Sequence, residues 1–480
     1  MNKSEFLLRE KHGRGWFALE RISPQTVLLL LSAFILLVAA FGGSSRPDPV
    51  QIVPLRTLAA LFLIPAVGLM DRKSWSQAPA LLGLAGAFVL WMAVQLMPLP
   101  PSIWHGLPDR AIIAQVDRLV GLDDNWRPLS LAPMRGTAAL VSLVVPAAAL
   151  LLALACRFTS KLILHAILAI GLINAMLGLI QVGTGPESPL YFYLYVARRS
   201  AAGLFANENH STVFSVVVLL IIARLAAESH LANRGDLFGT KVAYPAAFVF
   251  ILLTVLVSGS RAGLAALFVA LGAAAVMASK LAIALPRQRR RAQGNTRLWR
   301  GSAGLSMLFL ALAMVLIGVF FLQERTPALQ EILDKSSFDD LRWRIFPILQ
   351  EMVARHWLLG TGFGSFDMLY QTYEPTELVM VAYVNHAHND WMQLVIEGGL
   401  PASLLLVALL AWIASSILKL RCDARPQRSS IALVFWCAVM IVIGAASIVD
   451  YPLRTPIFQV VGVWLLACLE RDAKNRDADP

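Results

Sequence analysis

Residues 136–156 have the sequence GTAALVSLVVPAAALLLALAC, a run of 21 residues without a charged side chain. A helix needs about 20 mostly apolar residues to cross the hydrocarbon core of a bilayer. Arg135 precedes the run and Arg157 follows it. This stretch therefore predicts one membrane-spanning helix that is flanked by charged residues.

Comparable apolar runs recur along the chain. Of its 480 residues, 58% are hydrophobic and 15% are charged, and the mean hydropathy is +0.66. A water-soluble globular domain does not normally show this balance. The predicted spans are residues 26–42, 52–70, 80–97, 136–156, 162–182, 207–223, 242–257, 262–283, 302–322, 397–417, 431–448 and 455–469. We expect an all-α, polytopic integral membrane protein with about twelve transmembrane helices, whose even number places both termini on one side.

The distribution of Lys and Arg supports this count. Cytoplasmic loops are normally the basic ones, and an error of one span would scatter the basic clusters over both faces. In the twelve-span topology the clusters share one face: Lys3, Arg9, Lys11, Arg14, Arg21, Arg72, Lys73, Arg157, Lys161, Arg224, Arg234, Lys241, Arg287, Arg289, Arg290, Arg291, Arg297, Arg300, Lys419, Arg421, Arg425 and Arg428. That face, with both termini, is predicted to be cytoplasmic.

The net charge of +11 is therefore mostly a consequence of topology. The basic cytoplasmic loop 285–301 is expected to meet anionic membrane lipids rather than nucleic acid. Cysteine usage adds a second limit, because none of the four cysteines stands in a CxxC spacing or in a large outward loop. This argues against a disulfide framework, structural zinc and redox chemistry.

Four predicted outward segments are large or polar enough to build a site. They are residues 99–135, 183–206, 258–261 and 323–396. The last is a large loop between spans nine and ten, and it belongs to a single transmembrane domain over residues 1–480. Within it, the apolar spacing of residues 341–357 predicts a helix that lies against the bilayer.

A short polar turn with the sequence VSGSRAG joins two spans at residues 257–263. Ser260 is a candidate N-cap for the following helix, and Arg261 with the free N–H groups of that helix would attract an anion. The alternative is an interfacial arginine that holds a lipid phosphate. Spacing alone does not favour either interpretation.

Arg342 and Arg344 open the predicted loop helix, after Asp339 and Asp340. Taken alone, they are better explained as a surface network with these acids. A guanidinium nevertheless stays charged and grips phosphate oxygens in a bidentate manner, as a pyrophosphate site requires.

The segment VNHAHNDWMQL at residues 384–394 places His388 where a polar loop enters an apolar helix. Asn389 and Asp390 are good helix starters, so the imidazole is expected at the mouth of span ten. A histidine there can serve as a neutral base, or it can only bond the start of the helix. His386 is expected to point elsewhere.

Two further motifs are predicted to be structural. Asn207, Asn209 and His210 open span six and are favoured as capping and packing groups rather than catalysts. The two asparagines, like Ser260, Asn389 and Asp390, are expected to support the site. The glycine run 360–364 lacks the Lys-Ser/Thr ending of a P-loop and predicts a turn.

Together these motifs resemble the O-antigen ligase and polymerase family of bacterial membrane glycosyltransferases. The resemblance covers residues 203–209, 258–263, 342–366 and the segment HNDWMQL with EGGL at residues 388–400. Their order, spacing and predicted outward placement agree with the family, across the central and C-terminal parts of the chain.

The resemblance implies that a glycan leaves an undecaprenyl pyrophosphate carrier and joins an acceptor hydroxyl at the periplasmic face of the bacterial inner membrane. Arg261 and Arg342 resemble the arginines that hold the pyrophosphate, and His388 resembles the histidine proposed to activate the acceptor. No metal or other cofactor is expected. The acceptor is lipid A core, a growing glycan or a protein hydroxyl, and the motifs are shared by all three branches. A secondary transporter is the alternative from another class, and a non-catalytic scaffold for envelope assembly is a third.

Overall fold

The protein is described by a computed structural model that covers residues 23–46, 49–196, 198, 200–231, 242–284, 341–379, 384–422 and 426–474. The predicted span 302–322 and the basic loop 285–301 lie outside the described residues. So do residues 323–340 of the predicted large loop and the N-terminal basic cluster.

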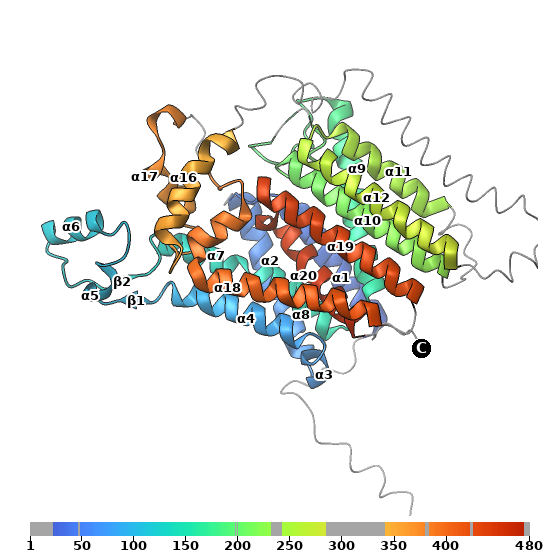
Figure 1. Ribbon diagram of the computed structural model, residues 1–480, viewed down its shortest axis with the longest axis horizontal. Coiled ribbons are helices and arrows are strands. Elements are labelled where there is room, and N and C mark those ends of the chain that lie inside the picture. Colours follow the sequence, from blue (N-terminus) through green and yellow to red (C-terminus); the bar gives the residue numbers. More distant parts are fainter. Residues whose placement is uncertain are drawn as a thin grey trace, which may run out of the picture.

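The described chain is mainly helical (Figure 1). Its α-helices are α1 (Pro24–Phe41), α2 (Pro49–Leu69), α3 (Arg72–Trp75), α4 (Pro79–Val94), α5 (Pro101–Trp104), α6 (Ala111–Leu119), α7 (Pro133–Ser142), α8 (Val144–Ala155), α9 (Ser160–Thr184), α10 (Glu208–Leu231), α11 (Tyr244–Val257), α12 (Arg261–Ala284), α16 (Leu341–His356), α17 (Phe366–Tyr373), α18 (Asp390–Lys419), α19 (Pro426–Val449) and α20 (Pro456–Ala473). Three single turns of 3₁₀ helix follow Pro375, Lys419 and Tyr451: η3 (Thr376–Leu378), η4 (Leu420–Cys422) and η5 (Pro452–Arg454). Two short strands, β1 (Pro98–Leu99) and β2 (Arg127–Pro128), pair antiparallel.

Helices occupy the eleven predicted spans that fall within the described residues. Among these residues, eight helical segments are long and apolar enough to cross a membrane, and α7 with α8 forms one of them. Helices α4 and α11 are apolar but shorter. The chain is thus an all-α polytopic membrane protein, as predicted. The total of twelve spans stays a prediction.

Helix α10 is the centre of the bundle. It packs against α9, α11, α12 and α19, and most of its length is buried. Small residues allow these close contacts. A Cβ on Gly263 would lie 2.1 Å from the Thr212 side chain, so the first turns of α12 and α10 touch directly.

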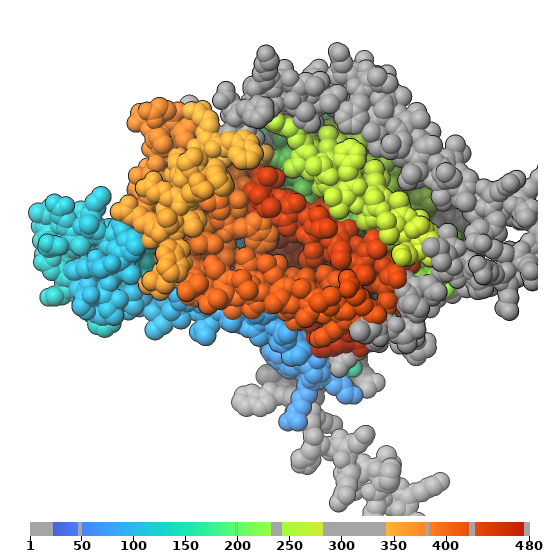
Figure 2. Space-filling view, in the orientation of Figure 1, coloured from blue at the N-terminus to red at the C-terminus, as the bar shows by residue number. Residues whose placement is uncertain are grey.

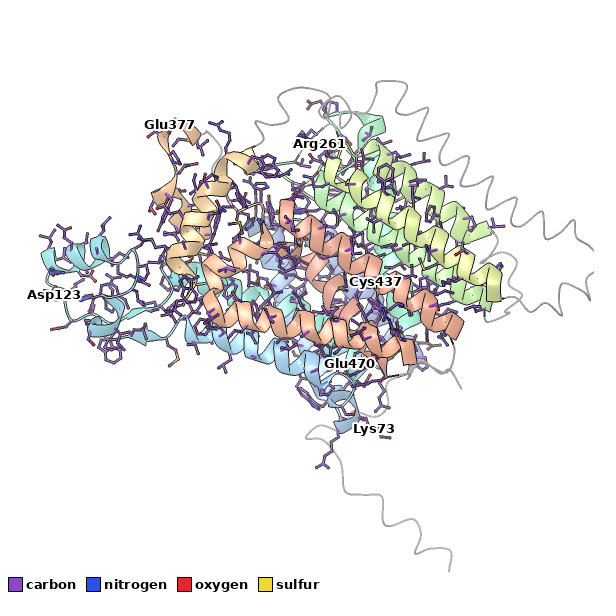
Figure 3. All side chains as sticks on the ribbon, viewed as in Figure 1. Lys73, Asp123, Arg261, Glu377, Cys437 and Glu470 are labelled. Carbon is purple, nitrogen blue, oxygen red and sulfur yellow. The ribbon has the colours of Figure 1, made fainter. Side chains whose placement is uncertain are left out.

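The basic clusters that fall within the described residues meet at one end of the bundle. Arg157 pairs with Asp71 at 2.6 Å, next to Arg72 and Lys73. Arg224, near the end of α10, pairs with Asp472 at 2.8 Å. Figure 3 labels Lys73 and Glu470 near this end and Arg261 far from it. The clusters therefore share one face, as the twelve-span topology requires.

Beyond the opposite end, a first loop at residues 95–132 and a second segment at residues 341–379, which are distant in sequence, pack into one lobe (Figure 2). Asp109 of the first loop accepts from His356 at 2.9 Å and from Tyr373 at 2.6 Å. Arg135 pairs with Asp367 of α17. The predicted loop helix is present as α16. Its apolar side is buried against α17 in a small core, so the expectation that this side lies against the bilayer is wrong.

Candidate active site

The starts of α10, α12 and α18 and the end of α19 lie at the same end of the bundle, which we call the site end. Asn209 of α10 donates to Asp450, one residue beyond α19, at 3.0 Å. Asp390, the first residue of α18, accepts from the Leu453 N–H at 3.2 Å. Together with the contact of Gly263 and Thr212, these contacts fix the four helix ends beside one another.

His388 directly precedes the N-cap of α18. The Asn389 side chain accepts from the Met392 N–H at 3.0 Å, which confirms the predicted cap. The backbone of His388 has a φ of 49°, in the left-handed region that a residue other than glycine seldom adopts. Such strain persists where the surroundings hold it, and here the Ala387 N–H is fixed by the Gln393 side chain at 3.0 Å.

The buried carboxylate of Asp450 is the hub of the site. His210 Nε2 lies 3.4 Å and His388 Nδ1 lies 3.7 Å from its Oδ1 atom. An arginine nitrogen of Arg342 lies 3.7 Å from Oδ2, and Asn207 and Asn209 donate to Oδ2 at 3.4 and 3.0 Å. The distances to His388 and Arg342 are longer than those of hydrogen bonds.

Exposure separates the two histidines. The His210 side chain is 2% exposed and that of His388 is 23% exposed. His388 is therefore the one whose ring is open to a substrate, while His210 supports the carboxylate from within.

Tyr451 joins the three histidines. Its ring centroid lies 5.0 Å from that of His210, 4.5 Å from that of His386 and 4.9 Å from that of His388. The expectation that His386 points away from His388 is wrong, because the left-handed turn at His388 brings both rings onto one tyrosine.

Electrostatics keep the hub charged. Burial alone would raise the pKa of Asp450, but the facing imidazole of His210, with a smaller contribution from His388, holds this pKa well below its usual range. Burial lowers the pKa of His386 well below its usual value, helped by Arg454. Burial and Asp450 raise the pKa of Tyr451 to about 12. The Asp450 carboxyl group, the His210 and His386 imidazoles and the Tyr451 phenol thus surround His388.

A second buried network supports the His388 loop from below. Arg454 bridges Asp390 at 3.3 Å and Glu397 at 3.0 Å. The other oxygen of Glu397 accepts from the Gly364 N–H at 3.0 Å. The predicted turn at residues 360–364 is confirmed, and it packs against the kink of α18 at Gly399. Asp390 is therefore a structural partner of Arg454 beneath the site.

Of the two arginines at the start of α16, one reaches the hub. Arg342 approaches Asp450, whereas the Arg344 side chain is exposed. The helical turn between them accounts for this difference, since residues two apart do not face the same way.

Arg261 begins α12 at the same end of the bundle. Ser260 accepts from the Gly263 N–H at 3.0 Å and so caps the helix as predicted. The partial positive charge of a 24-residue helix therefore adds to that of the guanidinium.

The loop before α10 is held by two buried polar residues of α9. Asn174 accepts from the Leu204 N–H at 2.9 Å, and Gln181 accepts from the Gly203 N–H at 2.7 Å. Asn207 then accepts from the Asn209 N–H at 2.8 Å. These asparagines were predicted to cap the helix and to support the site, and both donate to Asp450.

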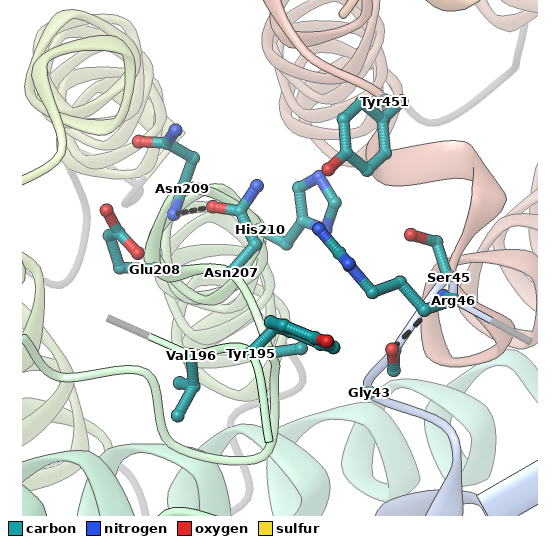
Figure 4. A pocket seen from close by; sticks show the side chains of 12 residues that line it. Gly43, Ser45, Arg46, Tyr195, Val196, Asn207, Glu208, Asn209, His210 and Tyr451 are labelled. Atoms are coloured by element: carbon teal, nitrogen blue, oxygen red, sulfur yellow. Dashed lines mark hydrogen bonds between the residues drawn. The ribbon is translucent and has the colours of Figure 1, made fainter. Parts of the chain in front are cut away.

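A cavity of about 270 Å³ opens beside the hub (Figure 4). It is lined by Gly43, Ser44, Ser45, Arg46, Tyr195, Val196, Ala206, Asn207, Glu208, Asn209, His210 and Tyr451. His388 is not among these residues, but it contacts Tyr451 in the wall.

Sequence reasoning missed three groups of this site: Asp450, Tyr451 and Arg46. A signal for the first two exists in residues 448–454, IVDYPLR, where ionisable residues follow an apolar span directly. Arg46 lies in a short polar connection between the first two spans.

The fold and this cluster define a polytopic membrane protein with a histidine and carboxylate site at one end of its bundle. Residues 246–407 match the family model of the O-antigen ligase domain. This match over about a third of the chain supports the family expected from the motifs, the O-antigen ligase and polymerase family. The family indicates an enzyme of the glycosyltransferase type. No curated protein matches the chain.

The matched region contains Arg261, Arg342 and His388. Asp450 and the pocket residues listed above lie outside it. Their part in the site comes from the structure alone.

Proposed function

We propose that the protein transfers a glycan from an undecaprenyl pyrophosphate carrier to an acceptor hydroxyl at the periplasmic face of the bacterial inner membrane. One observation carries the proposal. The partly exposed imidazole of His388 lies beside the buried carboxylate of Asp450, and Arg342 approaches the same carboxylate. The proposed base, His388, and the positive charge of Arg342 thus lie close together at one end of the helix bundle.

His388 acts as the general base. Asp450 lies at Nδ1, and the ring geometry directs Nε2 to the opposite side. A carboxylate at one nitrogen fixes the tautomer and stabilises the cation that forms when the other nitrogen takes a proton. The acceptor hydroxyl loses its proton to Nε2 while its oxygen bonds to the anomeric carbon.

The bond between that carbon and the pyrophosphate oxygen breaks in the same step. The electron pair leaves with undecaprenyl pyrophosphate, and direct displacement inverts the anomeric centre. Arg261 and Arg342 stabilise the leaving pyrophosphate by fixed positive charge, without a metal. Arg344, on the exposed side of α16, would meet the donor only from outside the cluster.

The position of the basic clusters supports the periplasmic assignment. They meet at the end of the bundle opposite the site end, and basic loops face the cytoplasm. The same arrangement argues against a secondary transporter. A transporter binds its substrate near the middle of the membrane, whereas the ionisable residues around His388 gather at helix ends.

The acceptor separates the branches of the family. The experiment incubates purified protein with a defined lipid-linked glycan and, in separate reactions, lipid A core, a second lipid-linked repeat or a Ser-rich protein. We expect sugar transfer to lipid A core or to the second repeat. Transfer to the protein would instead assign an oligosaccharyltransferase. Absence of transfer to any acceptor, with solute movement across proteoliposomes, would overturn the transferase proposal.

A further inference from the structure

The cavity beside Asp450 is used neither by the proposed base nor by the pyrophosphate arginines. We propose that it binds one neutral pyranose residue of the glycan. This inference rests on the proposed function and names a sugar subsite within it.

The polar groups of the cavity include both hydrogen-bond donors and hydrogen-bond acceptors. Arg46 offers only hydrogen-bond donors and the Glu208 carboxyl group offers acceptor oxygens, whereas the hydroxyls of Ser44 and Ser45 both donate and accept. An anion in this space would meet the oxygens of Glu208, and a cation would meet the positive charge of Arg46. A neutral ring with several hydroxyls satisfies both kinds of partner at once.

The placement of these groups agrees with their chemistry. Figure 4 shows Arg46 entering from one side of the cavity and Glu208 on the other, with Asn207 and His210 between them. The space is therefore bounded by donors and acceptors on different sides, as the hydroxyls around a sugar ring require.

Tyrosines supply the apolar component. Tyr195 is 62% exposed, and the guanidinium carbon of Arg46 lies over one face of its ring, 4.5 Å from the ring centroid. Tyr451 is buried and forms another part of the wall. Aromatic faces carry partial negative charge and attract the C–H groups of a sugar face. The exposed Tyr195 ring is the residue suited to that contact.

The wall that carries Arg46 is held rigidly. The Gly43 N–H donates to the Tyr193 hydroxyl at 3.0 Å, and the Gly43 carbonyl accepts from the Ala206 N–H at 3.0 Å. A Cβ on Gly43 would lie 1.7 Å from the Leu204 carbonyl oxygen. The loop after α1 is thus fixed against the loop before α10, which makes the cavity a preformed site.

Residues that line the cavity also contact Asp450 and His388 directly. Asn209 and His210 line it and contact Asp450. Tyr451 lines it and contacts His388. A sugar bound here would therefore lie next to the reacting bond, in either the donor or the acceptor.

The first test measures binding of methyl glycosides to the purified full-length protein by saturation-transfer NMR. The probes are methyl glucoside, galactoside, mannoside, rhamnoside and N-acetylglucosaminide, with methyl glucuronide and inorganic pyrophosphate as anions. We expect at least one neutral glycoside to bind, with affinity reduced about tenfold in Glu208→Gln and in Tyr195→Ala. Leu194→Ala, an exposed neighbour outside the cavity lining, is the matched control.

Three results would overturn the subsite. They are failure of every neutral glycoside to bind, binding that is equal in Tyr195→Ala and wild type, and preferential binding of an anion that is lost in Arg46→Gln but kept in Glu208→Gln.

The second test identifies the source of the sugar in the transfer reaction. Tyr195→Ala should raise the KM for the donor if the sugar belongs to the donor, or the KM for the acceptor if it belongs to the acceptor, with kcat changed less. If wild-type protein transfers glycan and both KM values stay unchanged, the subsite is wrong and the transferase stands. If wild-type protein transfers nothing but still binds glycosides through Tyr195, the transferase proposal fails separately.

Discussion

Asp450 contacts side chains from three other parts of the chain. His210 and Asn209 come from the start of α10, Arg342 comes from α16, and His388 comes from the loop before α18. A buried charge of this kind is stable because each neighbour donates to it or carries positive charge. Removing the charge of Asp450 should therefore change the positions of these side chains together.

The first prediction concerns His388 and Asp450. His388→Ala should lower kcat by about 10² to 10⁴, the usual contribution of a general base. Asp450→Asn should cause a similar loss, because the imidazole tautomer is no longer fixed. The two losses should not add in the double variant, since the residues act as a unit. The measurement is transfer from a lipid-linked donor.

His165→Ala, on α9 beside Lys161 and Tyr244 and remote from the hub, is the control and should keep full activity. A folded His388→Ala protein with near-normal transfer would remove His388 from the role of base.

The second prediction concerns Arg261. Arg261→Lys keeps the charge but loses the bidentate contact with phosphate oxygens. We expect weaker use of the donor, seen as a higher donor KM, with little change in the acceptor KM. Arg118→Lys, an exposed substitution on α6, should change neither value. Unchanged donor kinetics in Arg261→Lys would argue against the pyrophosphate clamp.

At the scale of elements, α18 is divided by a kink. Gly399 has a φ of 62°, and a Cβ there would lie 2.5 Å from the Gly360 nitrogen. The kink turns the first part of the helix, which follows His388, against the turn at residues 360–364. This close approach of two backbones is what requires glycine.

The third prediction follows from that contact. Gly399→Ala should lose about 1 to 3 kcal/mol of stability, because alanine is strained at this φ and its methyl group has no space. Thermal unfolding of the detergent-purified protein measures the loss. Gly272→Ala in α12 is the matched control, since nothing lies within 4 Å of its added Cβ. Equal melting temperatures for the two variants would contradict the assigned contact.

The fourth prediction concerns the link between α16, α17 and the first loop. His356 is buried among Asp109, Arg110, Arg355 and Tyr373. Burial lowers the pKa of His356, although Asp109 opposes the shift. The unfolded chain therefore binds a proton more readily than the folded one, and stability is lost as pH falls below about 6.5 toward the lowered pKa.

Hydrogen exchange of α16 and α17, corrected for the intrinsic rate, should show faster opening at pH 5.5 than at pH 7.5. His356→Gln should remove most of this pH dependence. Wild-type opening rates that do not change between pH 5.5 and pH 7.5 would contradict the predicted role of His356.

At the scale of the whole molecule, the basic residues and the site lie at opposite ends of the bundle. The fifth prediction tests this topology by labelling single cysteines in a chain whose native cysteines are changed to serine. A cysteine at Asp123 should react with a membrane-impermeant thiol reagent in intact spheroplasts. A cysteine at Lys73 should react only after permeabilisation. The reverse pattern would invert the proposed orientation.

Much of this architecture was predictable because hydropathy has a length scale that the bilayer sets. The predicted span 136–156 corresponds to α7 and α8 together, and the predicted span 162–182 corresponds to α9. The caps at Ser260 and Asn389 were also predictable, since they depend on neighbouring residues. These features are local in sequence.

The cluster around Asp450 was not predictable, because its contacts join residues that are far apart in sequence. Asp450 meets His210 across 240 residues and His388 across 62. A lone acid after an apolar run does not reveal which helix ends will surround it. The kink at Gly399 and the left-handed turn at His388 depend likewise on tertiary contacts, so the meeting of His386 and His388 on Tyr451 emerges only in three dimensions.

The position of Asp450 between α19 and α20 also has a consequence for biogenesis. Chains are synthesised from the N-terminus, and earlier segments fold first. The arginines and histidines of the site are therefore in place before the carboxylate that organises them is made. The proposed pair of His388 and Asp450 cannot assemble until α19 has been made, so the site remains incomplete while the earlier helices enter the membrane.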